Sequence, residues 1–201
     1  MEPDRRDLRD NVTIWGMYGK FVGKLNVNVG SALNHVVAPE TWLNVDVNSN
    51  CKPDICCDMR QLSRYVENAD TILASHVLEH LDGYRTLFAV MDQFWRALKP
   101  GGRVLIFVPH GLSNIAWEDP FHLIRFSPST FTYFISGMYN TPGNAGYGAS
   151  QGVPTHPWEI DALTQVPNPE YAKLADEELD KVSMQFNNVI SEIHCVMRRT
   201  V

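Results

Sequence analysis

The clearest hydrophobic pattern in the chain lies between Ala69 and Pro109. Apolar residues recur at three- and four-residue spacing there, as on one face of an amphipathic helix: Tyr84, Leu87, Phe88, Met91, Phe94, Trp95 and Leu98. Pro100 and the two glycines after it are expected to end this helix and turn the chain. A strand is expected before the helix at 71–74. The segment 104–108 is apolar without alternation, which is typical of a buried parallel strand. The stretch therefore predicts a βαβ unit.

Shorter apolar segments predict three more strands, at 25–29, 42–47 and 54–58, and a short helix at 62–68. Strands at this spacing indicate an α/β fold, a Rossmann-like open and mostly parallel sheet with helices on both faces. At the end of the chain, 182–186 and 189–197 flank an Asn187-Asn188 turn and predict a C-terminal antiparallel hairpin.

The segment from 136 to 169 is dense in glycine, proline and asparagine. It follows Ser127-Pro128, which is typical of a capped helix start. A structureless stretch of this length is usually either a functional cover or a disordered segment. We expect a single domain over residues 1–201, in which 137–170 forms a lid or insertion on the substrate side.

Open parallel sheets bind ligands beyond the carboxyl ends of their strands, near the point where the strand order reverses. The residues expected at these ends are Asn28, Gly30, Asp46, Asp58, Ser75, His76, Pro109 and His110. Among them Asp46 and Asp58 are carboxylates spaced to meet a ribose and a base, and a carboxylate is a natural acceptor for a vicinal diol.

Composition narrows the classes of function. Hydrophobic residues at 44% and charged residues at 20% are typical of a soluble globular protein, and a net charge of -6 argues against nucleic acid as a partner. The charged N-terminus lacks the apolar core of a signal peptide, and no run approaches the roughly 20 apolar residues of a membrane span. We therefore expect a cytoplasmic protein without a membrane partner. Its four cysteines, two of them adjacent, are expected to be reduced thiols.

Five short motifs, spread over about residues 24–135, carry a family resemblance through their order and spacing. They are Lys24-Leu25-Asn26-Val27 leading to Gly30, Trp42-Leu43-Asn44-Val45-Asp46, Ala74-Ser75-His76-Val77-Leu78-Glu79-His80-Leu81, Leu98-Lys99-Pro100-Gly101-Gly102, and Asp119-Pro120-Phe121-His122 followed by Phe126-Ser127-Pro128. Together they resemble the class I S-adenosylmethionine-dependent methyltransferases, and within them a small branch of predicted methyltransferases. The resemblance implies a methyltransferase that uses S-adenosylmethionine as its cofactor.

The resemblance also implies roles for individual residues. The turn from Asn28 through Gly30 to Ala32 would approach the methionine part of the cofactor, and Asp46 would accept hydrogen bonds from the ribose hydroxyls. The remaining cofactor-binding residues would be Asp58 and Met59 beside the adenine, and Ser75 and His76 beside the sulfonium.

One feature departs from the family pattern. The three positions that usually carry glycine read Asn28, Gly30 and Ala32. Glycine serves there because the backbone takes positive φ and comes close to the ligand. Asn tolerates left-handed geometry, but its side chain occupies space. A second hypothesis is therefore a binding module of the same fold that has lost catalysis or binds the cofactor weakly.

A rival motif gives a third hypothesis. The residues from His76 through Glu79 to His80 spell H-x-x-E-H, in which two histidines one helical turn apart bind Zn²⁺ and the glutamate acts as base. A third ligand would come from Glu118, Asp119 or Glu159. Since the motif directly follows a strand instead of lying within a long helix, we expect no metal and rank a zinc hydrolase last.

Methyl transfer needs mainly alignment of the nucleophile with the sulfonium methyl. A hydroxyl acceptor would also benefit from a general base, for which His110 is the best-placed candidate. Asp119 and His122 are second candidates that would orient the substrate or share the proton. The acceptor is expected to be a small molecule or sugar-like compound.

Overall fold

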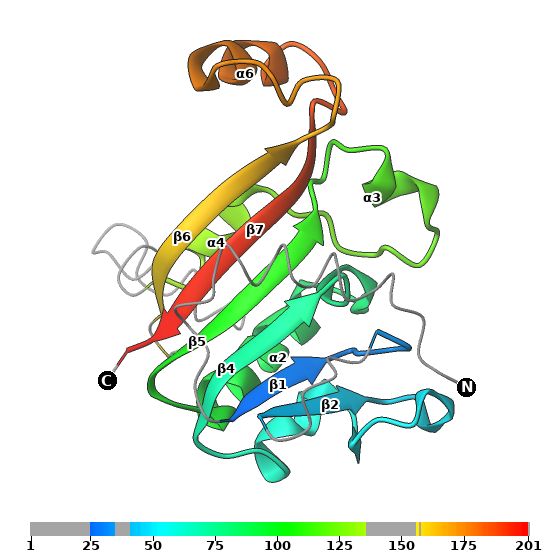
Figure 1. Ribbon diagram of the computed structural model, residues 1–201, viewed down its shortest axis with the longest axis vertical. Coiled ribbons are helices and arrows are strands. Elements are labelled where there is room, and N and C mark those ends of the chain that lie inside the picture. Colours follow the sequence, from blue (N-terminus) through cyan, green and yellow to red (C-terminus); the bar gives the residue numbers. More distant parts are fainter. Residues whose placement is uncertain (1–24, 35–40, 136–155, 157, 201) are drawn as a thin grey trace.

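The computed structural model describes residues 25–34, 41–135, 156 and 158–200, through which a twisted sheet runs (Figure 1). Its strands lie in the order β3-β2-β1-β4-β5-β7-β6. They are β1 (Asn26–Val29), β2 (Trp42–Asp46), β3 (Ile55–Cys56), β4 (Ala69–Ser75), β5 (Leu98–Pro109), β6 (Trp158–Pro167) and β7 (Ile190–Arg199). β1 to β5 pair in parallel, whereas β7 pairs antiparallel with both β5 and β6. The mostly parallel, Rossmann-like sheet is confirmed.

In the central part of the chain, the helices connect the strands as the sequence predicted. They are α2 (Tyr84–Ala97), α3 (Ile115–Glu118), α4 (Pro128–Thr132) and α6 (Asp176–Ser183), with 3-10 turns η2 (Ser49–Cys51), η3 (Met59–Arg64) and η4 (Leu78–His80). α2 is the predicted crossover between β4 and β5. α4 has the predicted start, with Pro128 in its first turn and a capping box between Ser127 and Thr130.

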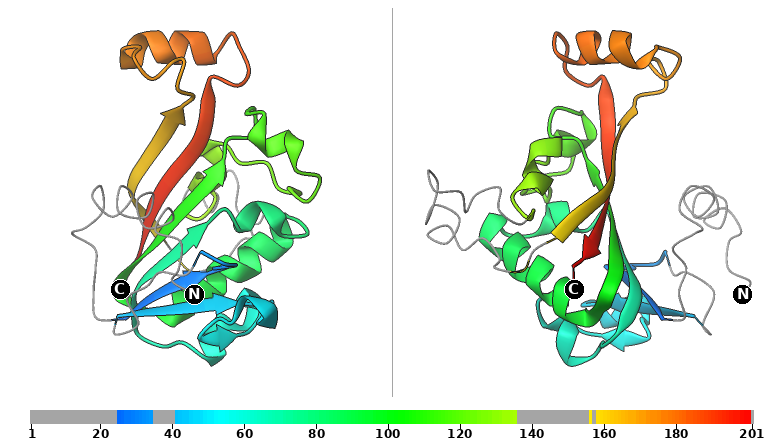
Figure 2. Two further views of the ribbon diagram at one scale, coloured as in Figure 1. Left: turned by 45° about the vertical axis from the view of Figure 1, so that its right-hand side comes forward. Right: turned by 90° about the vertical axis from the view of Figure 1, so that its left-hand side faces the viewer.

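The main core lies between α2 and one face of the sheet. The buried side chains of α2 are Leu87, Val90, Met91, Phe94 and Ala97. They share one cluster with alternate residues of β5, namely Val104, Ile106 and Val108, whereas Leu105 and Phe107 join a separate cluster with Trp42, Leu73 and Val196. Figure 2 shows α2 and α4 on the same side of the sheet. The prediction that helices cover both faces of the sheet falls in part on residues outside the described ranges.

The junction between α2 and β5 differs from the prediction. α2 ends at Ala97, and Leu98 is already extended, with φ -75° and ψ 151°. A helical conformation is sterically disfavoured for Lys99, because Pro100 follows it. A Cβ at Gly102 would lie 2.9 Å from the carbonyl oxygen of Ala69, so the chain passes close to β4 there. The segment predicted as a turn therefore begins β5, with a shift in register between the two strands.

The C-terminal part of the fold corrects two predictions. The antiparallel partner of β7 is β6, and the segment predicted as a strand at 182–186 instead forms the last two residues of α6 and the turn after it. Acidic residues fill the first turn of α6, where the helix dipole favours them. β6 occupies 158–167, which was predicted to lack structure, and the rest of the predicted lid falls largely outside the described residues. In Figure 1, α6 lies beyond the end of the β6–β7 ribbon, away from α2.

Smaller differences concern the segment after β3. The predicted helix at 62–68 is the 3-10 turn η3, which starts earlier because Asp58 caps it through a 2.8 Å hydrogen bond from the Arg60 backbone N–H. All four cysteines are free thiols, of which Cys57 and Cys195 are buried. Within the described residues no helix has both the length and the apolarity needed to cross a bilayer.

Candidate functional site

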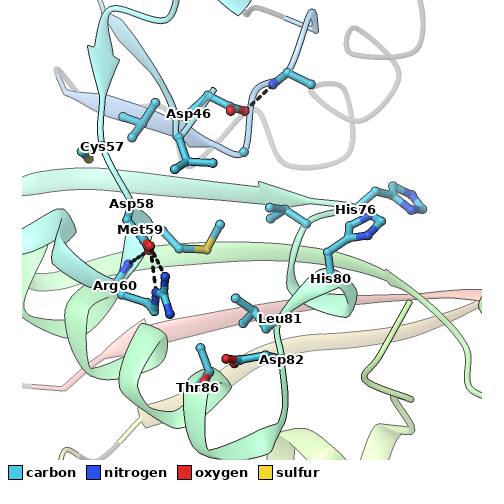
Figure 3. Close-up of a pocket in the computed structure, with 15 residues that line it drawn as sticks. Asp46, Cys57, Asp58, Met59, Arg60, His76, His80, Leu81, Asp82 and Thr86 are labelled. Carbon is cyan, nitrogen blue, oxygen red and sulfur yellow. Dashed lines mark hydrogen bonds and ion pairs between the residues drawn. The ribbon is translucent and has the colours of Figure 1, made fainter. Parts of the chain in front are cut away.

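A cavity of about 470 Å³ opens at the carboxyl ends of β1, β2, β3 and β4 (Figure 3). The strand order reverses here, because β2 lies on one side of β1 and β4 on the other. Open α/β sheets bind their ligands at this place. The lining residues come from the strand ends, the loops after them and the start of α2: Gly30, Ala32, Val45, Asp46, Val47, Cys57, Asp58, Met59, Arg60, His76, Val77, His80, Leu81, Asp82 and Thr86.

Asp46 lies at the end of β2 and lines the cavity. Its Oδ2 accepts a 2.8 Å hydrogen bond from the backbone N–H of Ala32, and its Oδ1 accepts one of 2.8 Å from the backbone N–H of Asn48. These two bonds fix the carboxylate between the loops that follow β1 and β2. Since an ionised carboxylate has about four acceptor sites, each oxygen can accept a further hydrogen bond.

The altered turn after β1 keeps its backbone geometry. Gly30 has φ +65°, and a Cβ there would lie 2.2 Å from Cγ2 of Val77, so glycine is required at this position. Ala32, where glycine is usual in the family, also takes positive φ, at 44°. Two of the three family glycine positions thus retain the left-handed backbone that glycine normally provides.

Asn28 does not line the cavity, in contrast to the prediction from the family pattern. Its buried side chain donates one 3.1 Å hydrogen bond to Oδ1 of Asn44 and another of 3.1 Å to the carbonyl oxygen of Asn34. Asn28 and Asn44 are paired in the register of β1 and β2, which brings the two amides together. The amide therefore ties the strands and the loop to one another.

Asp58 and Met59 follow β3 on the side of the cavity opposite the histidines (Figure 3). The Asp58 carboxylate is paired with Arg60, whose Nε donates to Oδ2 at 2.8 Å and whose Nη2 donates at 2.5 Å. These hydrogen bonds lower the pKa of Asp58, so the carboxylate stays ionised. Met59 offers an apolar surface beside this ion pair.

His76 follows β4, and its backbone has φ 49°, which is uncommon for a residue with a side chain. Its Nδ1 lies 3.4 Å from Oε1 of Glu79, and its Nε2 lies 3.4 Å from Oε1 of Glu192 on β7. Burial acts to lower the pKa of His76, but the contacts with Glu192 and Glu79 outweigh it and raise the pKa to about 10. His76 is therefore a cation at one end of the cavity. Ser75, the last residue of β4, does not line the cavity.

The three predicted catalytic residues lie in the segment after β5, and none lines the cavity. His110 accepts a 3.3 Å hydrogen bond from the backbone N–H of Leu112 at its Nδ1, and burial lowers the pKa of its imidazole. Asp119 and His122 are close together, with Oδ2 of Asp119 3.7 Å from Nε2 of His122. His122 also lies 4.0 Å from Oε1 of Glu79. Asp119 and His122 therefore approach the loop after β4.

The H-x-x-E-H motif does not adopt the arrangement of a zinc protease. His76 lies directly after β4 in a left-handed conformation, while Glu79 and His80 belong to the 3-10 turn η4. The two histidines are therefore not one α-helical turn apart. The zinc-hydrolase hypothesis depended on two histidines one helical turn apart, and His76 and His80 do not have this arrangement.

Several lining residues escaped the sequence prediction, and four of them have side chains that can form hydrogen bonds with a ligand. These are Arg60, His80, Asp82 and Thr86, in the loops after β3 and β4 and at the start of α2. They lie at least two residues beyond the strand ends, so the strand-end rule does not select them. His80 alone carried a signal, as part of the H-x-x-E-H motif.

The cavity has the groups that S-adenosylmethionine requires. Asp46 offers free acceptor positions to a diol, and no side chain projects from Gly30. Val47, Met59 and Leu81 give apolar lining for a flat base. The donor and acceptor chemistry of these residues fits the cofactor.

Comparisons with known proteins agree with this architecture. Residues 19–106 match the family model described as a methyltransferase domain. A S-adenosylmethionine-dependent methyltransferase from Archaeoglobus fulgidus is 15% identical, with a TM-score of 0.63 over 96% of this chain and 94% of that chain. The N-methyltransferase NodS from Bradyrhizobium japonicum WM9, in complex with S-adenosyl-L-homocysteine, is 14% identical, with a TM-score of 0.57 over 98% and 89%. Among curated proteins, none matches this sequence. Residues 19–106 are thus similar to a methyltransferase domain, and the chain shares the fold of S-adenosylmethionine-dependent methyltransferases.

Proposed function

We propose that this chain binds S-adenosylmethionine in the cavity at the ends of β1 to β4 and transfers its methyl group to a small-molecule or sugar-like acceptor. The observation that best supports the proposal is the position of the Asp46 carboxylate in this cavity. Its carboxylate is fixed by two backbone N–H groups at the strand-order reversal, and both of its oxygens can accept further bonds. This is what recognition of a ribose diol requires.

We assign the other lining residues to different parts of the cofactor. The turn at Gly30 and Ala32 borders the methionine part, and Asp58 and Met59 border the adenine. His76 lies at the sulfonium end. Because its imidazolium is already paired with Glu79 and Glu192, its charge is compensated within the protein. When bound, the cofactor supplies an electrophilic methyl group, and the chain's part is to orient the acceptor atom toward it.

A hydroxyl acceptor must also lose a proton, and His110 is the residue we assign to take it. Burial lowers the pKa of His110, which keeps the imidazole neutral near pH 7. In the described part of the chain, its Nδ1 lone pair accepts a single hydrogen bond, the 3.3 Å bond from the backbone N–H of Leu112, which an acceptor hydroxyl can replace. Asp119 and His122 would orient the acceptor on the same side.

The hypothesis of a weakly binding module rested on the altered glycine turn. Two observations favour the enzyme instead. The Asn28 amide is engaged with Asn44 and Asn34, and Gly30 and Ala32 retain positive φ. The turn that approaches the ligand is therefore not filled by the Asn28 side chain.

Isothermal titration calorimetry with S-adenosylmethionine and S-adenosyl-L-homocysteine tests the proposal. The parent chain is expected to bind with micromolar affinity, about 8 kcal/mol. Asp46→Ala is expected to bind at least tenfold more weakly, because the diol loses its acceptor. Asp180→Ala on the distant α6 is the matched control, and His110→Ala should also bind like the parent. Absence of binding to the parent chain would make the binding module the better hypothesis.

A further inference from the structure

The carboxylate of Glu79 is buried without a hydrogen bond among the described residues. Its side chain is 1% exposed, and neither Oε1 nor Oε2 has a hydrogen-bond partner there. Two imidazole nitrogens approach Oε1 at distances longer than a normal hydrogen bond, namely Nδ1 of the His76 cation at 3.4 Å and Nε2 of His122 at 4.0 Å. The His76 cation, which Glu79 shares with Glu192, offsets part of this charge, but a carboxylate buried without hydrogen bonds is still costly, and a bound metal cation would relieve that cost.

Two histidines lie beside this carboxylate. Ligand atoms of Glu79, His80 and His122 all fall within 4.8 Å of one another. The rings of His80 and His122 meet edge to face, with centroids 4.7 Å apart. The backbone joins the two segments, because the carbonyl oxygen of Glu79 accepts hydrogen bonds from the N–H groups of Leu123 at 2.7 Å and Ile124 at 3.0 Å. The loop after β4 therefore holds the end of the segment 119–124 at a fixed position.

His122 is oriented as a metal-binding histidine is. Its Nδ1 lies 3.0 Å from the carbonyl oxygen of Ile115, which can only accept, so Nδ1 carries the proton. Nε2 is then left with its lone pair, facing Glu79 and Asp119. A backbone carbonyl that fixes the tautomer of a ligating imidazole in this way is the usual second partner of such a ligand.

Asp119 supplies a fourth ligand atom, a carboxylate oxygen, near this cluster. Its Oδ1 accepts a 2.8 Å hydrogen bond from the backbone N–H of Phe121, while Oδ2 lies 3.7 Å from Nε2 of His122. The side chain is thus fixed through one oxygen and leaves the other directed at the histidine.

We propose that Glu79, His80 and His122 bind a divalent transition metal ion, with Asp119 as the fourth ligand. Two imidazoles and two carboxylates favour Zn²⁺, and after it Co²⁺ or Mn²⁺, over Mg²⁺ and Ca²⁺, which take mainly oxygen ligands. In a tetrahedral site with bonds of roughly 2.0–2.1 Å, the ligand atoms are about 3.4 Å apart. The ligand atoms of Glu79, His80 and His122, which lie within 4.8 Å of one another, therefore draw together by about an ångström on binding. The exposed His80 side chain has the freedom to make this movement.

This site differs from the zinc-protease arrangement of H-x-x-E-H, because His122 takes the place of His76 and Glu79 becomes a ligand. It borders the cofactor cavity, since His80 lines both. Metal binding at these residues does not depend on S-adenosylmethionine.

The first test is titration of the full chain, treated with chelator and then freed of it, with Zn²⁺ and separately with Co²⁺ in the absence of cofactor. We expect one Zn²⁺ per chain at micromolar or tighter affinity. Co²⁺ should give a visible absorption spectrum of a four-coordinate site, and Zn²⁺ should abolish it. No binding at one equivalent, or binding of Mg²⁺ with equal affinity, would overturn the proposal.

Substitutions test which residues bind the metal ion. His80→Ala changes an exposed side chain and should fold normally, yet bind Zn²⁺ at least 100-fold more weakly, and Glu79→Gln should lose affinity to a similar extent. His156→Ala is the matched control, because this histidine pairs with Asp92 on α2, away from the cluster. Circular dichroism verifies folding of each variant. Parent-like affinity in His80→Ala, or an equal loss in His156→Ala, would show that the ion binds elsewhere.

Discussion

The amide of Asn28 connects three segments of the chain. It donates to Asn44 on β2 and to the carbonyl oxygen of Asn34 in the loop after β1. Asn44 in turn donates from its backbone N–H to Oδ2 of Asp54 at 2.7 Å. A polar chain of this kind lies largely buried and holds the edge of the sheet beside the cavity.

Replacement of Asn28 with glycine tests whether this residue serves stability or obstructs the cofactor. Asn28→Gly removes two hydrogen bonds and adds backbone entropy in the unfolded chain, so we expect a loss of about 2 kcal/mol in the free energy of unfolding. The affinity for S-adenosylmethionine should change by less than about threefold, a difference of roughly 0.6 kcal/mol. Urea unfolding and calorimetry measure the two effects. A gain of tenfold in affinity would mean that the amide obstructs the ligand.

Glu192 gives the molecule an acid-sensitive contact. Its Oε2 lies 2.9 Å from Nε2 of His194, and its Oε1 lies 3.4 Å from Nε2 of His76. These two histidines lower the pKa of Glu192 from 4.5 to about 2. A carboxylate with a depressed pKa stabilises the folded state above its unfolded pKa, and this stabilisation is lost as the pH falls through the folded pKa.

We therefore expect the stability difference between the parent and Glu192→Gln to be largest between about pH 5 and 6 and to shrink toward pH 2. It also shrinks as the pH rises from about 6.5 toward 10, because the contact with Glu192 helps to raise the pKa of His76. The difference is at most about 3 kcal/mol, from the size of the shift. Urea denaturation at a series of pH values between 2.5 and 7 measures it. Glu178→Gln on α6 is the control and should show no such trend. A stability difference between the parent and Glu192→Gln that stays constant over the whole pH range would show that the contacts of Glu192 with the two histidines do not stabilise the fold.

At the level of single residues, the strand-end rule selected several residues that line the cavity, but it also selected Ser75 and His110, which do not line it. Asp46 and His76 line the cavity as expected because the carboxyl ends of parallel strands meet at one edge. Asn28 was predicted from a family pattern, but its side chain bonds to a neighbouring strand, and no local pattern shows which way an amide turns. His122 near Glu79 is a contact between segments 43 residues apart, which spacing alone does not predict.

The secondary-structure elements also differ in how well the sequence predicts them. β1, β2, β4 and α2 were predictable because their periodicity is strong and their ends are marked. β6 was missed, although Trp158, Ile160 and Ala162 alternate with polar residues, because the glycine-rich segment before it suggested a loop. β7 was predicted, but its partner was not, since strand pairing over a long connection depends on the whole sheet.

The start of β5 gives a prediction at the level of elements. A Cβ at Gly102 would lie 2.9 Å from the carbonyl oxygens of Ala69 and Lys99, both parts of the backbone. Gly102→Ala should therefore force β4 and β5 apart and lower the free energy of unfolding by about 1–3 kcal/mol. Lys99→Ala nearby removes only a partly exposed ion pair with Asp70 and should cost less than about 1 kcal/mol. Urea unfolding of both variants measures the contrast, and equal losses would contradict it.

In the molecule as a whole, the cavity that we propose for the cofactor is built mainly by one half of the sheet. β1 to β4 and the start of α2 supply the cavity, while β5 and the segment after it supply Asp119 and His122, beside the loop of β4. The antiparallel β7 contributes Glu192, which reaches His76 from the other half of the sheet. The two halves therefore meet at the loop after β4, where the proposed cofactor cavity and the proposed metal site share His80.

If the cavity is formed only when this sheet is folded, S-adenosylmethionine must stabilise the whole chain. A ligand at 100 times its dissociation constant adds about 2.7 kcal/mol when it binds the folded state alone. For a chain of this size, each kcal/mol raises the unfolding midpoint by roughly 2–4 °C, so a rise of about 5–11 °C is expected. Differential scanning calorimetry with and without S-adenosylmethionine measures it, with Asp180→Ala expected to behave like the parent. Asp46→Ala at the same ligand concentration should show a smaller rise, because less of its folded state is occupied. An unchanged midpoint for the parent at saturating ligand would contradict a cavity that only the folded sheet provides.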